Sequence, residues 1–147
     1  AAAVRAPAAL QGRVLLVEDE AMVSEYMVDL LTGWGLDVVL ERDPLAAAAR
    51  LESGGERFDL LLTDQTMPGL TGLALARQAR QHQPGLPTLV YTGNASEIGE
   101  QDLAECGVTG LLRKPIEGAT LQPLLRDLLR RAAAPRAPST RAGACAE

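Results

Sequence analysis

Short apolar runs alternate with segments of helical spacing along most of the chain, and this alternation limits the fold more than any other feature of the sequence. Five runs have the length and apolar character of strands, at residues 14–17, 37–41, 58–63, 87–92 and 109–113. Each run is followed by a segment with the pattern of a helix, at residues 20–33, 44–53, 71–81, 97–106 and 118–131. This order predicts an α/β fold in which helices cover both faces of a five-stranded parallel sheet.

The composition excludes several function classes. The 147 residues carry 14 Lys and Arg against 19 Asp and Glu, a formal net charge of −5 at pH 7. A nucleic-acid-binding module needs a basic stripe that neutralises phosphates, so we predict no direct contact with nucleic acid. Apolar residues make up 47% of the chain, which is enough for a packed core, yet the apolar runs are too short to cross a membrane. We therefore predict no membrane contact by this domain.

The two ends of the chain differ from the alternating region. Residues 1–12 are Ala-rich and predict a linker, and residues 132–147 lack apolar periodicity, which predicts a flexible tail. The region between them, residues 13–131, is then a single domain. Cys106 and Cys145 are too few for a disulfide framework or a zinc site, so we expect free thiols in a reducing compartment, the cytoplasm.

Polar residues gather where four of the five predicted strands end. They are Glu18, Asp19 and Glu20 at the first strand, Asp64 at the third, Thr92 at the fourth and Lys114 at the fifth. Because the carboxyl ends of parallel strands meet at one edge of a sheet, we expect these side chains to lie close together there. Lys114 is the only Lys among 14 cationic residues, and a compact ammonium suits a site that needs a point charge.

This set of residues suits the binding and transfer of a phosphoryl group. Clustered acids repel one another unless a cation lies between them, and oxygen ligands without His or Cys favour a hard cation such as Mg²⁺. An ammonium and a hydroxyl supply the counter-charge and hydrogen bond that phosphoryl oxygens need, and an Asp carboxylate can act as nucleophile. Alone, Thr92 would more simply start a turn and Lys114 would be a surface residue. Their joint position with Asp64 at one edge favours the phosphoryl site.

Four segments in this order resemble the receiver domain of two-component response regulators: VLLVEDE, LLLTDQTMPGLTG, VYTGNA and GLLRKPI, all within residues 13–131. The resemblance implies a flavodoxin-like, doubly wound parallel sheet of five strands in the order 2-1-3-4-5 with five helices. It implies that Asp64 is the phosphoacceptor. It also implies that Mg²⁺ is bound by Asp64, by Asp19 directly, by Glu18 mostly through water, and by the main-chain carbonyl of Thr66.

The same resemblance assigns the remaining polar residues. It implies that Thr92 and Lys114 each bind a phosphoryl oxygen, that the Lys114–Pro115 peptide bond is cis, and that the small Gly93 leaves the phosphoryl group room to enter. Leu111 departs from the family, which commonly carries Tyr or Phe three residues before the Lys. In the family the rotamer of that ring follows the movement of the Thr, so Leu111 leaves open a muted output surface or a different route to it.

The resulting hypothesis is the phosphoacceptor domain of a two-component phosphorelay. Its partner is a histidine kinase or a histidine phosphotransfer protein, whose phosphohistidine donates the phosphoryl group, and a weak homodimer is left open. The domain is not expected to be a turnover enzyme beyond its own phosphorylation and slow dephosphorylation. A receiver-like interaction module that is not phosphorylated and a phosphate sink or shuttle stay open as alternatives. The missing start Met and the Ala- and Pro-rich ends favour the C-terminal receiver of a hybrid sensor histidine kinase over a stand-alone regulator.

Two other function classes fit the sequence less well. A dehalogenase-like phosphatase needs a second Asp two residues after its nucleophile, where this chain has Thr66. A flavodoxin-like cofactor binder needs a hydroxyl-rich phosphate loop after the first strand, where Glu18, Asp19 and Glu20 would repel the cofactor phosphate.

Overall fold

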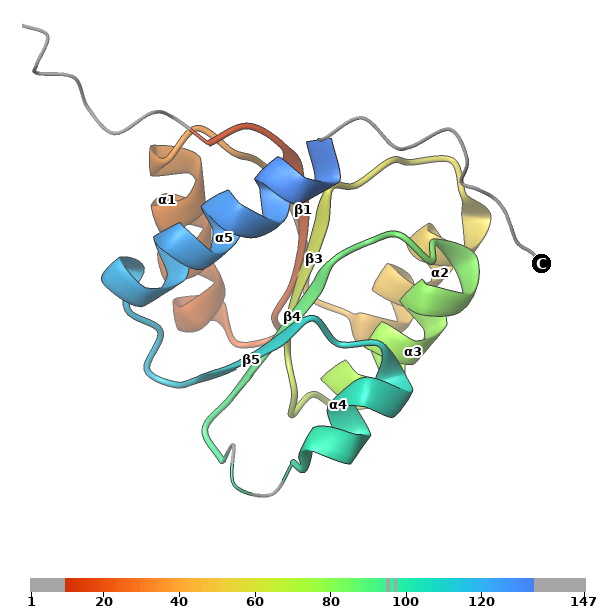
Figure 1. Ribbon diagram of the computed structural model, residues 1–147. Helices are drawn as coiled ribbons and strands as arrows, with labels where there is room; N and C mark the ends of the chain where they lie inside the picture. The colour runs from red at the N-terminus through yellow and green to blue at the C-terminus, as the bar shows by residue number, and fades with distance from the viewer. Residues whose placement is uncertain (1–9, 95, 97, 134–147) are drawn as a thin grey trace, which may run out of the picture.

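The computed structural model describes residues 10–94, 96 and 98–133. These residues form a sheet of five parallel strands in the order β2-β1-β3-β4-β5, with helices on both faces (Figure 1). The strands are β1 (Arg13–Val17), β2 (Asp37–Glu41), β3 (Leu60–Asp64), β4 (Thr88–Thr92) and β5 (Gly110–Arg113). The helices are α1 (Ala21–Gly33), α2 (Pro44–Ser53), α3 (Gly72–His82), α4 (Glu100–Cys106) and α5 (Gly118–Ala133). The predicted fold class, strand order and number of helices are confirmed.

Most elements differ from the expected ranges by one to three residues at an end, and two of these differences have a clear physical reason. β3 begins later than expected but includes Asp64, because Asp64 pairs in register with Tyr91 of β4. α4 begins at Glu100 because the Gly99 N–H donates to a carboxylate oxygen of Asp102, 3.1 Å away, and this contact caps the first turn. The end of β3 therefore places Asp64 inside the sheet rather than in a free loop.

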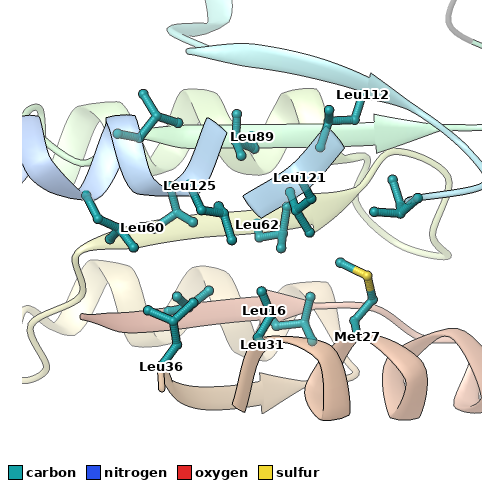
Figure 2. Packing of buried hydrophobic residues seen from close by; sticks show 14 of the residues in the cluster. Leu16, Met27, Leu31, Leu36, Leu60, Leu62, Leu89, Leu112, Leu121 and Leu125 are labelled. Carbon is teal, nitrogen blue, oxygen red and sulfur yellow. The ribbon is translucent and has the colours of Figure 1, made fainter. Parts of the chain in front are cut away.

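Side chains alternate between two apolar cores on opposite faces of the sheet. The helices α1 and α5 lie on one face, and α2, α3 and α4 lie on the other (Figure 1). Leu16 of β1 packs in a cluster with Leu31 of α1 and Leu125 of α5, as Figure 2 shows. The preceding residue of β1, Leu15, points to the opposite face and belongs to the second cluster together with Leu75 of α3. Because both faces are buried, the central residues of the strands are mainly apolar, and the close packing on both faces makes the sheet a rigid platform for its edge.

The start of α3 packs directly against the end of β3. The Gly72 N–H donates to the main-chain carbonyl of Gln65 (3.0 Å), and the side-chain Oε1 of Gln65 accepts the N–H of Leu73 (2.8 Å). A Cβ atom on Gly72 would collide with the main-chain carbonyl of Asp64. Glycine therefore lets the helix approach the strand that carries Asp64.

The core also reaches beyond the first strand. Leu10 is buried in the cluster of α1 and α5, and its N–H donates to the Trp34 carbonyl (2.8 Å). The described residues do not include residues 1–9 of the expected linker, residues 134–147 of the expected tail, or Cys145. Cys106 is a buried free thiol. No helix in the described part of the chain is both long and apolar enough to cross a bilayer.

The close approach of α3 to β3 generates a testable prediction. Gly72→Ala should lower the free energy of unfolding by about 1–3 kcal/mol, because the new methyl group meets backbone that cannot move aside locally. Urea unfolding measures the change. Gly33→Ala is the matched control, since no atom lies within 4 Å of a Cβ built there. Equal stability of the two variants would contradict the packing described for α3.

Candidate active site

The parallel register brings the predicted polar residues to one edge of the sheet. Glu18 and Asp19 follow β1, Asp64 ends β3, Thr92 ends β4 and Lys114 follows β5. Carboxylate oxygens of Glu18, Asp19 and Asp64 lie within 4.8 Å of one another. The Lys114 Nζ lies 3.3 Å from Oδ1 of Asp64. Residues from separate strands thus meet in one small volume, as the sequence predicts.

The carboxylate of Asp64 is buried and its two oxygens differ in their contacts. The residue is 4% exposed. Its Oδ1 accepts the Gln65 N–H at 2.8 Å and forms the ion pair with Lys114. Within residues 10–94, 96 and 98–133, Oδ2 accepts no hydrogen bond. One oxygen is therefore held by the protein, while the other is free to take part in chemistry.

Glu18 is a fully buried carboxylate whose two oxygens both accept hydrogen bonds. Its Oε1 accepts the Tyr91 hydroxyl at 2.6 Å, and its Oε2 accepts the Glu20 N–H at 3.1 Å. Burial raises the pKa of Glu18 above its usual value, and the charge of Asp64 adds to the rise. The hydrogen bonds from Tyr91 and Glu20 and the charge of Lys114 act in the opposite direction. A cation bound beside this carboxylate would favour its charged form.

The charges of the cluster indicate what it can bind. Three carboxylates face one ammonium, which leaves two negative charges without a partner in the cluster. The side-chain donors are all oxygen atoms, and His and Cys ligands are absent from the cluster. A hard divalent cation such as Mg²⁺ fits this donor set and this charge. The exposed Asp19 opens the cluster to solvent on one side.

Thr92 and Lys114 are joined through the backbone. The Lys114 N–H donates to the Thr92 carbonyl at 2.9 Å, and the Lys114–Pro115 peptide bond is cis, as expected. The hydroxyl of Thr92 accepts the Asn94 N–H at 3.1 Å, so its own proton stays available to donate. No atom lies within 4 Å of a Cβ built on Gly93, so there is open space beside the hydroxyl.

Thr66 lies in the loop between β3 and α3, two residues after Asp64, and its side chain is exposed. The role of its main-chain carbonyl as a metal ligand stays a prediction.

One residue of the site was missed from the sequence. Tyr91 is fully buried in β4, and its hydroxyl bonds Glu18, while its ring centroid lies 5.5 Å from the Lys114 Nζ. Burial and the neighbouring charge of Glu18 raise the pKa of Tyr91, so the phenol stays protonated and keeps its donor. A Tyr in an otherwise apolar buried strand was the available signal, because a buried phenol needs an acceptor. The sequence pattern did not show which acceptor.

Charge repulsion in the cluster generates a second prediction. Without metal, Asp19→Asn should raise the free energy of unfolding by about 1 kcal/mol, because one of three mutually repelling carboxylates is removed. The gain in stability on adding Mg²⁺ should shrink in the same variant. Urea unfolding with a chelator, and then with Mg²⁺, measures both effects. The control is Asp29→Asn, which changes an exposed residue of α1. If Asp19→Asn without metal is no more stable than this control, the carboxylates do not repel one another as described.

Known proteins share both the sequence and the fold. Residues 14–126 match the family model described as the response regulator receiver domain. Transcription factor prr1 of Schizosaccharomyces pombe is 35% identical over 119 residues, which cover 81% of this chain and 22% of prr1. Chemotaxis protein CheY-3 of Vibrio cholerae is 31% identical over 122 residues, which cover 81% of this chain and 92% of CheY-3. The chain thus spans about a fifth of prr1 but most of CheY-3.

A solved structure gives the same result. The receiver domain of a Pseudomonas aeruginosa sensor histidine kinase, with a magnesium ion coordinated in its active-site cleft, superposes with a TM-score of 0.73 and 27% identity. The match covers 82% of this chain and 99% of that domain. With most of its length matched by the family model and by these relatives, the chain belongs to the response regulator receiver domain family of two-component signalling.

Proposed function

We propose that this receiver domain accepts a phosphoryl group on Asp64 and thereby switches a protein-interaction surface. The observation that carries the proposal is a buried carboxylate within a charged cluster. Lys114 lies 3.3 Å from its Oδ1, and the carboxylates of Glu18 and Asp19 lie within 4.8 Å. Because the Gln65 N–H and Lys114 hold Oδ1, we assign Oδ2 as the nucleophile.

The acidic cluster supports a divalent cation as cofactor. We propose that Mg²⁺ is held by Asp19, Asp64 and the main-chain carbonyl of Thr66, with Glu18 acting mostly through water. When bound, Mg²⁺ would neutralise negative charge on the phosphoryl oxygens. The oxygen-only donor set and the two uncompensated charges support this assignment, as does the magnesium ion in the related Pseudomonas aeruginosa domain.

The proposed transfer exchanges one bond to phosphorus for another. Asp64 Oδ2 forms a P–O bond while the P–N bond of the donor phosphohistidine breaks, and the bonding electron pair returns to the imidazole nitrogen. Lys114 then pairs with one phosphoryl oxygen, and the Thr92 hydroxyl donates a hydrogen bond to another. The open space at Gly93 admits the group. The chain's own residues thus position the phosphoryl group and balance its charge.

The proposed donor is a histidine kinase or a histidine phosphotransfer protein, and the proposed compartment is the cytoplasm. The family acts in two-component signalling, and the buried free thiol of Cys106 agrees with a reducing compartment. A module that is not phosphorylated is not favoured, because the acidic residues, Thr92 and Lys114 meet at one edge. An origin in a hybrid sensor histidine kinase remains a prediction.

Labelling with a small phosphodonor tests the assignment of Asp64. Acetyl phosphate with Mg²⁺ should add one phosphoryl group to the wild-type chain and none to Asp64→Asn, because an amide oxygen cannot form the acyl phosphate. Intact-mass spectrometry measures the adduct. Asp29→Asn, remote from the cluster, should be labelled like the wild type. Undiminished labelling of Asp64→Asn would place the phosphoacceptor elsewhere.

A further inference from the structure

Tyr91 contacts three separate parts of the site. Its backbone pairs in register with Asp64, and its carbonyl accepts the Gln65 N–H at 2.9 Å. Its hydroxyl donates to Glu18 at 2.6 Å, and its ring lies beside the ammonium of Lys114, 5.5 Å from the centroid. Because β3 lies between β4 and β1 in the sheet, the phenol reaches past the strand of Asp64 to meet Glu18. One residue of β4 thus contacts Asp64 through its backbone, and Glu18 and Lys114 through its side chain.

Glu18 depends on this contact more than an exposed acid would. The residue has no exposed surface, so each carboxylate oxygen needs a donor from the protein. The Glu20 N–H serves Oε2, and the Tyr91 hydroxyl serves Oε1. Without the phenol, one oxygen of a buried charge would lose its donor and the side chain would lose one of its two fixed points. One carboxylate oxygen of Glu18 also lies within 4.8 Å of one oxygen each from Asp19 and Asp64, so a displaced Glu18 would change the cluster.

We propose that Tyr91 is a positioning residue for the divalent cation: its hydroxyl holds the carboxylate of Glu18 in the acidic cluster, and its ring supports Lys114. This inference rests on the proposed function, in which the cluster binds Mg²⁺. The hydroxyl acts through Glu18 and touches neither the cation nor the phosphoryl group. Partners behind the residues that bind a metal commonly control metal affinity, because they fix the orientation of the ligand.

The competing explanation is that Tyr91 only fills the core. Tyr91→Phe separates the two explanations because it removes the hydroxyl and keeps the ring against Lys114. A core-filling role predicts some loss of stability with unchanged Mg²⁺ affinity. A positioning role predicts a Mg²⁺ dissociation constant raised by about tenfold, measured by calorimetric titration of Mg²⁺ alone. Unchanged Mg²⁺ affinity in Tyr91→Phe would overturn the proposal.

The chain provides a matched control in its other tyrosine. The Tyr26 hydroxyl donates to the Ile116 carbonyl at 2.9 Å, outside the acidic cluster. Tyr26→Phe therefore removes a tyrosine hydroxyl that also donates to the protein, and should keep the wild-type Mg²⁺ affinity. A tenfold loss in both variants would show a general structural effect and would also overturn the proposal.

The Mg²⁺ dependence of acetyl phosphate labelling gives a second readout. In Tyr91→Phe the half-saturating Mg²⁺ concentration should rise about tenfold, while the rate at saturating Mg²⁺ stays near that of the wild type. A reduced rate at saturation with an unchanged half-saturating concentration would count against positioning through Glu18. If even the wild type is not labelled, the proposed function fails, while the calorimetric test of Tyr91 still stands.

A measurement on the unaltered sequence covers the case in which Tyr91→Phe does not fold. The chain contains two tyrosines, so fluorotyrosine labelling gives two fluorine signals. Adding Mg²⁺ should shift the signal of Tyr91 and leave that of Tyr26 in place, with the signals assigned through Tyr26→Phe. A Tyr91 signal that does not respond to saturating Mg²⁺ would overturn the proposal.

Discussion

Like charges gathered at the end of a parallel sheet are the constraint on which this site depends. Three carboxylates lie within 4.8 Å of one another, and two of them, Glu18 and Asp64, are buried. Three of the four carboxylate oxygens of these two residues have a donor, which lowers the cost of burying the cluster: the Tyr91 hydroxyl, the Glu20 and Gln65 N–H groups, and the Lys114 ammonium. The charge that remains is the driving force for binding a cation.

The rest of the fold holds these mutually repelling carboxylates in place at the edge of the sheet. Two apolar cores bury both faces of the sheet, so the strands cannot slide without exposing leucines on one face or the other. Gly72 lets α3 meet the backbone of Asp64 directly. The platform is therefore rigid at the residues that carry the charge, whereas Asp19 and Gly93 leave the cluster accessible from solvent.

The aromatic residue that contacts the site lies on β4 rather than on β5. Leu111 stands where the family commonly has Tyr or Phe, and it lies half-buried on β5 beside Val90 of β4. The next residue of β4, Tyr91, is instead the buried aromatic that touches both Glu18 and Lys114. An aromatic side chain therefore contacts the site from β4, and its hydroxyl donates to an acid.

Local periodicity and the position where each strand ends were enough to predict the fold class, the functional edge of the sheet, and the grouping of the acids with Thr92 and Lys114. The contact of Tyr91 with Glu18, 73 positions away, and the close approach of Gly72 to the carbonyl of Asp64 became visible only in the folded chain. Those contacts depend on the register and twist of the sheet, which bring distant parts of the backbone within ångströms of each other. The pattern of residues along one strand does not predict them, because it says nothing about the neighbouring strand.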